Sequence, residues 1–189
     1  MHIPYCVRKC PYCGFYSEGI GELSSQEASG VISDYVSRLI EEIGEGGDSL
    51  VNTAVDSIFI GGGTPSLLSV GDMKRLLDEL GKAFCLERDC EITMEANPGT
   101  LRAESLKGYR ELGVNRLSIG VQSFDDEVLK TLGRIHNSQE GEKAYFLARE
   151  AGFENINLDL MFGVPGQTLN KWECSFSRWG PSSWPLISE

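Results

Sequence analysis

The sequence has no apolar run close to the roughly 18 residues that a membrane-spanning helix needs, and no charged-then-apolar leader stands at its start. It is also short of basic residues, because 17 Lys and Arg face 28 Asp and Glu, a formal net charge of −11. Nucleic-acid phosphates require clustered Lys and Arg, so a nucleic-acid partner is not expected. Low-complexity segments are absent as well, and 41% hydrophobic residues suit a packed core. We therefore expect a folded protein of the soluble, intracellular type.

The sequence contains six cysteines, and their spacing does not suggest a disulfide framework. Cys6, Cys10 and Cys13 fall close together near the start. Tight clustering without a secretory signal favours metal ligation, and a chain of 189 residues can bury a core without disulfide bridges. We predict that the scattered cysteines are ordinary small hydrophobic residues. These are Cys85, Cys90 and Cys174.

Most of the remaining sequence alternates between strand-like and helix-like segments. Apolar residues at helical spacing predict helices within residues 32–43, 73–84, 104–112 and 144–151. Short apolar runs predict strands at residues 57–60, 91–96, 116–121 and 156–162. Strands that alternate with helices form parallel sheets with right-handed crossovers. The fold class is therefore α/β, either a barrel or a doubly wound sheet.

Polar or glycine-rich residues recur near the C-terminal ends of the predicted strands. They are residues 61–64, Glu95, Gln122 and Asp159. The C-terminal edge is where barrel enzymes gather their sites from several strands. This recurrence favours the barrel over the doubly wound sheet.

The segment from residue 6 to residue 13 carries the strongest chemical signal. Three thiolates can converge from this one loop, and soft thiolate sulfur selects iron–sulfur clusters or zinc. Three ligands would leave one iron of a four-iron cluster open to a small molecule. The alternative is a structural zinc site, with His2 or a distant cysteine as the fourth ligand. Zinc frameworks usually add a second short cysteine pair downstream, and this sequence has none, which favours the cluster.

The cysteine loop and the motifs after the predicted strands resemble the radical S-adenosylmethionine (SAM) superfamily. Within it, the sequence is similar to the branch that holds oxygen-independent coproporphyrinogen III oxidases and HemW-type heme chaperones. The resemblance implies a radical-SAM partial (β/α)6 barrel. The motifs that carry it lie at residues 2–17, 61–65, 95–98, 120–124, 132–136 and 157–161.

The resemblance also implies where the family core begins and ends. Residues 1–174 correspond to the radical SAM core, and residues 175–189 form an atypical tail with neither helical nor strand periodicity. The family's C-terminal domain is absent from this sequence. We therefore expect a barrel that is incomplete at both ends.

The resemblance assigns Cys6, Cys10 and Cys13 as ligands of a [4Fe–4S] cluster. The amino and carboxylate groups of SAM would chelate the open iron, and one electron from the cluster would cleave the sulfonium. The radical chemistry belongs to the cofactor, and the protein supplies ligation and orientation. Tyr12, inside the cysteine loop, corresponds to the aromatic wall beside the adenine.

Further cofactor contacts follow from the other motifs. Gly62, Gly63 and Thr64 correspond to the turn that approaches the amino group of SAM, where glycine allows a close approach of the backbone. Arg134 corresponds to a residue that faces the SAM carboxylate. His136 fits its motif but receives no chemical role. The family contacts to amino or ribose hydroxyl groups correspond to Glu95, Gln122 and Asp159.

One position separates the two branches of the family. In the oxidases, a further cysteine stands two positions after the third cluster cysteine, and here that position is Phe15. This favours a heme chaperone, with a coproporphyrinogen III oxidase that forms protoporphyrinogen IX as the alternative. The expected partners are heme or a porphyrinogen, an electron donor and a heme-acceptor protein. Free thiols and cluster chemistry predict a cytoplasmic location, with organelle targeting left open.

Overall fold

The protein is described here by a computed structural model that covers residues 1–47, 54–177 and 186–188. Within these residues, one parallel sheet has six strands in the order β1-β4-β5-β6-β7-β8. Two further short strands, β2 (Tyr5–Cys6) and β3 (Glu18–Gly19), pair with each other in parallel. The strands of the large sheet are β1 (His2–Ile3), β4 (Ala54–Gly62), β5 (Cys85–Ala96), β6 (Arg116–Gln122), β7 (Asn155–Leu160) and β8 (Leu186–Ser188).

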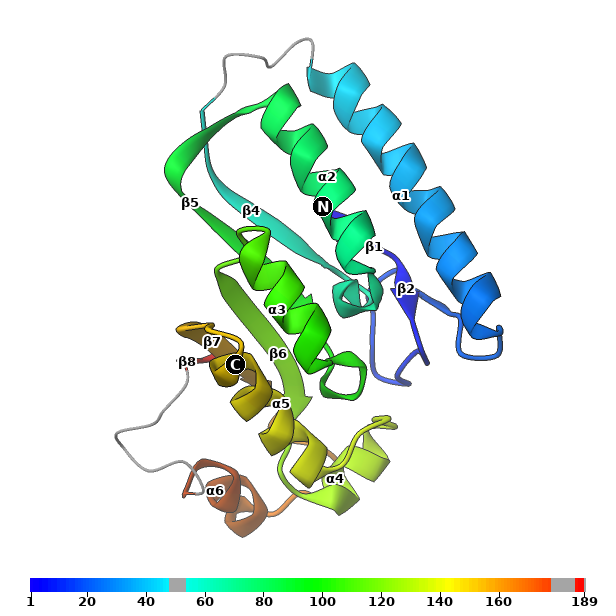
Figure 1. Ribbon diagram of the computed structural model, residues 1–189. Coiled ribbons are helices and arrows are strands. Elements are labelled where there is room, and N and C mark those ends of the chain that lie inside the picture. The colour runs from blue at the N-terminus through cyan, green and yellow to red at the C-terminus, as the bar shows by residue number, and fades with distance from the viewer. Residues whose placement is uncertain (48–53, 178–185, 189) are drawn as a thin grey trace.

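Helices connect the successive strands and cover one face of the sheet. In Figure 1, α1, α2, α3 and α5 lie side by side along that face, and each contacts the next. Short 3-10 turns, η1 (Pro65–Leu67) and η2 (Pro98–Thr100), follow β4 and β5. The helices are α1 (Ser25–Gly47), α2 (Val70–Ala83), α3 (Ala103–Glu111), α4 (Asp126–Thr131), α5 (Ser138–Glu150) and α6 (Leu169–Ser177).

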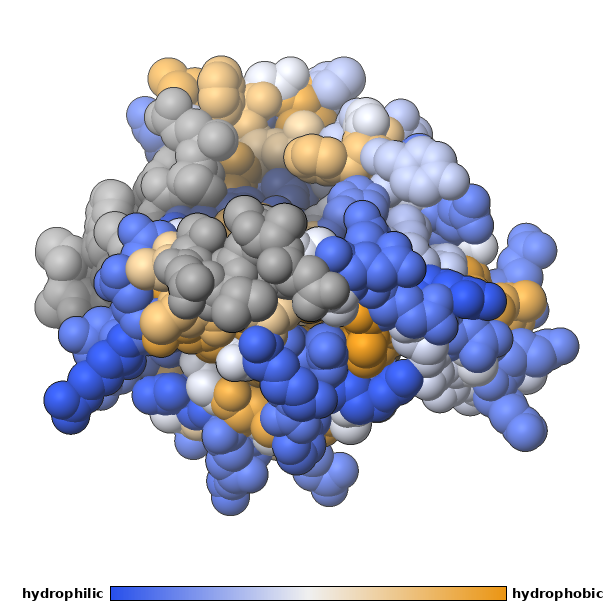
Figure 2. Space-filling model, turned by 90° about the horizontal axis from the view of Figure 1, so that it is seen from above, coloured by the Kyte–Doolittle hydropathy of each residue, from blue (hydrophilic) through white to orange (hydrophobic). Residues whose placement is uncertain are grey.

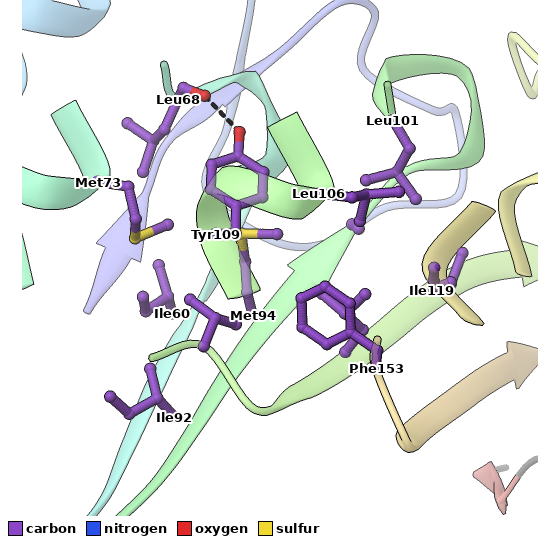
Figure 3. Packing of buried hydrophobic residues seen from close by; sticks show 14 of the residues in the cluster. Ile60, Leu68, Met73, Ile92, Met94, Leu101, Leu106, Tyr109, Ile119 and Phe153 are labelled. Atoms are coloured by element: carbon purple, nitrogen blue, oxygen red, sulfur yellow. Dashed lines mark hydrogen bonds between the residues drawn. The ribbon is translucent and has the colours of Figure 1, made fainter. Parts of the chain in front are cut away.

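The main hydrophobic core lies between the sheet and these helices. Successive strand residues point to opposite faces, and apolar side chains such as Ile60 and Met94 occupy the helix-facing positions. Figure 3 shows Met73 and Tyr109 packed against them, with the Tyr109 hydroxyl donating a hydrogen bond to the carbonyl of Leu68. Burial of this apolar face fixes which strand residues point the other way.

Capping residues fix the ends of several helices. The Ser69 side chain accepts a hydrogen bond from the Asp72 N–H at 3.0 Å, at the start of α2. Gly113 follows α3 with a φ of +103°, a conformation that suits glycine at a helix C-terminus. Ser69 lies in the connection from β4 to α2, and Gly113 lies in the connection from α3 to β6.

The surface is largely hydrophilic where Figure 2 shows it. From above, hydrophilic residues cover most of the visible face, and apolar residues form smaller patches. No helix in the described ranges combines the length and the apolar character that crossing a membrane requires.

The predicted helices and strands are present, with ends shifted by a few residues. The sequence patterns do not reveal α4, α6 or the two-residue strands. Residues 175–189 show no strand periodicity in the sequence, yet the structure places β8 there, where Leu186 pairs with Asn157 of β7. A strand of three residues is too short for periodicity to reveal, because its pairing with a neighbour defines it. Residues 178–185 and 189 of that tail lie outside the described residues.

Candidate functional site

A cavity of about 170 Å³ lies where the C-terminal ends of β4, β5, β6 and β7 meet the cysteine loop. Its position follows from the topology, because the carboxyl ends of parallel strands share one edge. The structure brings every residue that the sequence assigned to the site into the wall of this one cavity. These residues are Cys6, Cys10, Tyr12, Cys13, Gly62, Gly63, Thr64, Glu95, Gln122, Arg134 and Asp159.

Pairing of β2 with β3 holds the cysteine loop in place. The N–H of Ile20 donates to the carbonyl of Cys6 at 2.8 Å, and the N–H of Cys13 donates to the carbonyl of Cys10 at 3.1 Å. Arg8 lies within the loop and donates to the carbonyls of Gly133 and Arg134. The loop is therefore tied to a segment more than 120 residues away in the sequence. Nothing in the spacing of the cysteine motif marks this contact, so a role for Arg8 could not be predicted from the sequence.

Two hydrogen-bond donors from outside the loop face its sulfur atoms. Thr64 Oγ1 lies 3.4 Å from Cys6 Sγ, and Arg134 Nη1 lies 3.6 Å from Cys10 Sγ. The same Nη1 lies 3.4 Å from the Tyr12 hydroxyl, and Arg134 Nη2 donates to the carbonyl of Gly120 at 2.6 Å. Thiolate is the metal-binding form of cysteine, and a hydroxyl and a guanidinium are suited to stabilising its charge.

Arg134 and Tyr12 also line the cavity near its rim. Burial raises the pKa of the Tyr12 hydroxyl, while the positive charge of Arg134 acts in the opposite direction. Arg134 Nε is buried and has no hydrogen-bond partner among the described residues. A buried guanidinium nitrogen without a partner is a donor that a bound ligand can satisfy.

The end of β4 packs against the N-terminal segment more closely than a side chain would allow. A Cβ on Gly63 would lie 2.7 Å from the carbonyl oxygen of Tyr5. A Cβ on Gly62 would lie 2.6 Å from His2 Nδ1, and Gly62 also has a φ of +118°. Both positions therefore require glycine, one for space and the other for space and conformation.

Glu95 lies at the end of β5 with one oxygen already bound by the protein. The Gly62 N–H donates to Glu95 Oε2 at 2.9 Å. Burial raises the pKa of the Glu95 carboxyl above its usual range, and the Asp159 carboxylate adds to the rise, whereas the Gly62 N–H opposes it. An ionised carboxylate in such a place favours a positively charged ligand, because the ligand would offset the charge.

Asp159 is held by two polar residues that the sequence analysis did not identify. Ser118 Oγ lies 3.0 Å from both carboxylate oxygens, and Asn157 Nδ2 lies 2.6 Å from one of them. Ser118 of β6 and Asn157 of β7 are register partners, so the three side chains meet on the face opposite the core. Their alternation with apolar residues is the signal in the sequence that could have identified them.

Gln122 ends β6 in a conformation that is unusual for a residue with a side chain. Its φ is +67°, in the left-handed region. Its carbonyl accepts a hydrogen bond from the Met161 N–H at 2.9 Å, which helps to hold the turn. Strained residues of this kind cluster at ligand sites, and Gln122 lines the cavity.

The chemistry of the donor set suits an iron–sulfur cluster. Three cysteine side chains from one loop line the cavity, and soft thiolate sulfur is the ligand type of such clusters. Three thiolates would leave one iron of a four-iron cluster for another ligand. In the part of the chain that the structure describes, no three His, Cys, Asp or Glu side chains are grouped so that they could hold one metal ion. The glycine turn and the carboxylates beside it fit a small polar molecule.

A sequence model of the Radical SAM superfamily matches residues 1–175. The chain belongs to the radical SAM superfamily. It is 45% identical over 90% of its length to a heme chaperone HemW of Haemophilus influenzae and 48% identical over 90% to that of Escherichia coli. In both cases the chain spans 44% of the relative's length.

The radical SAM fold is also evident from solved structures. The structure of coproporphyrinogen III oxidase (HemN) from Escherichia coli, described as a radical SAM enzyme, matches with a TM-score of 0.82 at 31% identity. The match covers 94% of this chain and 39% of the other. It bears out the expected fold class, the partial barrel of the superfamily.

Proposed function

We propose that this radical SAM chain binds a [4Fe–4S] cluster through Cys6, Cys10 and Cys13 and holds SAM beside it. The observation that carries this proposal is the single cavity in which the three thiols meet polar groups from four strand ends. All three cysteines have free thiols. The bound cluster would supply the electron that cleaves the sulfonium of SAM, and the protein would bind and orient both groups.

Each polar group in the cavity suits one part of SAM. Glu95 offers a half-buried carboxylate to the amino group, and Arg134 Nε, which has no partner among the described residues, offers a donor to the carboxylate. Asp159 and Gln122 offer acceptors to the amino or ribose hydroxyl groups, and Tyr12 offers its ring to the adenine. Gly62 and Gly63 line the same cavity, where their backbone can approach a ligand closely.

We further propose that the chain acts in the manner of the heme chaperones that it resembles. Support comes from the relatives named heme chaperone HemW at 45% and 48% identity. Phe15 gives independent support, because it stands where the oxidases carry an additional cysteine. It is 65% exposed and lines the cavity, so an apolar ring replaces a thiol at the mouth. The partners would be heme, an electron donor and a protein that accepts heme.

The second candidate is oxidative decarboxylation of coproporphyrinogen III. The structural likeness to coproporphyrinogen III oxidase, with its TM-score of 0.82, favours this alternative. Both candidates use the same cluster and the same SAM site. They differ in whether a tetrapyrrole is bound and passed on or is chemically changed.

Anaerobic reconstitution with iron and sulfide tests the cofactor part of the proposal. The wild-type chain should acquire about four iron and four sulfide per chain. Replacing Cys6, Cys10 and Cys13 by Ala should abolish this uptake. Cys85→Ala is the matched control, because Cys85 is an exposed free cysteine outside the cavity, and its variant should load normally. Equal loading of the triple variant and the wild type would contradict the proposal.

A second experiment separates the two candidate functions. The cluster-loaded chain is incubated with coproporphyrinogen III, SAM and a reductant, and carbon dioxide is measured. In parallel, heme binding is followed by its absorption spectrum. Heme binding without carbon dioxide release supports the chaperone, and carbon dioxide release would overturn it.

A further inference from the structure

Ser17 has a buried hydroxyl for which the described part of the chain provides no partner. The residue is only 7% exposed, and its Oγ has no hydrogen-bond partner among residues 1–47, 54–177 and 186–188. Buried hydroxyls are nearly always hydrogen-bonded, so one without a partner calls for an explanation. Ser17 lines the cavity that holds the three thiols. A group bound in this cavity can therefore provide the missing acceptor.

The backbone on both sides of Ser17 is held in place. The carbonyl of Tyr16 accepts a hydrogen bond from His2 Nε2 at 3.0 Å, and the N–H of Glu18 donates to the carbonyl of Pro4 at 2.7 Å. Ser17 is thus tied to the segment that leads into Cys6. These contacts fix the backbone that carries the hydroxyl.

The position of Ser17 favours sulfur over the nucleotide as its partner. The carboxylate and amide side chains that suit SAM come from the ends of β5, β6 and β7, whereas Ser17 immediately precedes β3, the strand that pairs with β2 at Cys6. A hydroxyl already faces a sulfur atom in this cavity, because Thr64 Oγ1 lies 3.4 Å from Cys6 Sγ. The Ser17 hydroxyl would add a further donor to those of Thr64 and Arg134.

We infer that the Ser17 hydroxyl donates a hydrogen bond to a sulfur of the bound [4Fe–4S] cluster or its cysteine ligands and raises the reduction potential of the cluster. This inference rests on the proposed function. Hydrogen bonds to cluster sulfurs are one of the factors that set the potential of iron–sulfur centres. The physical reason is that the reduced cluster carries more negative charge and gains more from a donor than the oxidised one.

The test is a redox titration of the reconstituted chain without SAM, followed by EPR. Ser17→Ala should lower the ratio of reduced to oxidised cluster at a fixed solution potential about three- to tenfold, where tenfold corresponds to 59 mV for one electron. Ser17→Thr retains a hydroxyl and should restore most of the wild-type ratio. Ser138→Ala is the matched control, because Ser138 is a buried serine outside the cavity, and it should leave the ratio unchanged.

Two further measurements make the outcomes distinct. The cluster-free Ser17→Ala chain should unfold at the same or a higher temperature than the wild type, because the change removes a buried group without a partner. A fall in melting temperature with an unchanged potential would mean a structural role and overturn the inference. Weaker SAM binding with an unchanged potential would assign the hydroxyl to the nucleotide and overturn it as well. A wild-type chain that assembles no cluster would instead overturn the proposed function.

Discussion

Replacing Glu95 by Gln should weaken the binding of SAM without lowering the stability of the fold. The substitution keeps the shape of the side chain and an oxygen that can still accept from the Gly62 N–H, which lies 2.9 Å away. It removes only the negative charge. Because burial raises the pKa of Glu95, the folded protein disfavours the ionised form. Stability is then lost as the pH rises above the ordinary carboxyl pKa and through the raised one.

The expected effect on the fold is therefore neutral or favourable, and the effect on binding is unfavourable. At pH 7.5, Glu95→Gln should unfold at the same temperature as the wild type or at a higher one. Under the proposed function, the substitution removes a charge-assisted hydrogen bond to the amino group of SAM, a contribution of about 1.5–3 kcal/mol. Since about 1.4 kcal/mol corresponds to a factor of ten, the Kd for SAM should rise roughly 10- to 100-fold.

Anaerobic titration calorimetry on the reconstituted chain measures the Kd, and circular dichroism measures the melting temperature. Glu91→Gln provides the matched control, because Glu91 lies on β5, faces the same way as Glu95 and pairs with Arg116 outside the cavity at 3.1 Å. It should leave the Kd unchanged. An unchanged Kd in Glu95→Gln, or a clear loss of stability, would refute the reasoning about this carboxylate.

Three further predictions concern the fold around the site. Gly62→Ala should lower the free energy of unfolding by about 1–3 kcal/mol because of its φ of +118°, as denaturant titration would show, and an unchanged value would contradict the need for glycine. Tyr109→Phe leaves the buried Leu68 carbonyl without its donor and should cost about 1–3 kcal/mol in the same assay, whereas a neutral effect would mean that another donor replaces the hydroxyl. Burial lowers the pKa of His136 to about 4, so between pH 6.5 and 4 only the unfolded chain takes up the proton. At 1.36 kcal/mol for each pKa unit, the wild type should lose about 3 kcal/mol over this range, and His136→Gln should remove that component of the pH dependence.

Much of the fold could be predicted because hydrophobic periodicity and caps are local signals. The strand predicted at 116–121 is an example, because the structure has it as β6, Arg116–Gln122. Elements defined by distant partners could not be predicted in this way. β8 exists through its pairing with β7, and α4 has only six residues, too few to show a helical period.

In the candidate site, too, local features could be predicted and contacts between distant residues could not. The cysteine spacing and the residues at strand ends are visible in the sequence, and their meeting in one cavity follows from parallel topology. The contacts that hold them are not visible there. Arg8 reaches a carbonyl 125 residues away, and Ser118 reaches Asp159 on the neighbouring strand. Such contacts depend on register and loop geometry, which local patterns do not specify. The roles assigned to individual site residues stay predictions.

The most direct test of the account is the EPR spectrum of the reduced, reconstituted chain with and without SAM. If three thiolates leave one iron open, SAM binds that iron and shifts the g values of the cluster. The spectrum of a chain in which Cys6, Cys10 and Cys13 are replaced by Ala should show no cluster signal at all. A cluster signal that SAM leaves unchanged, or a wild-type chain that takes up no iron, would contradict the account.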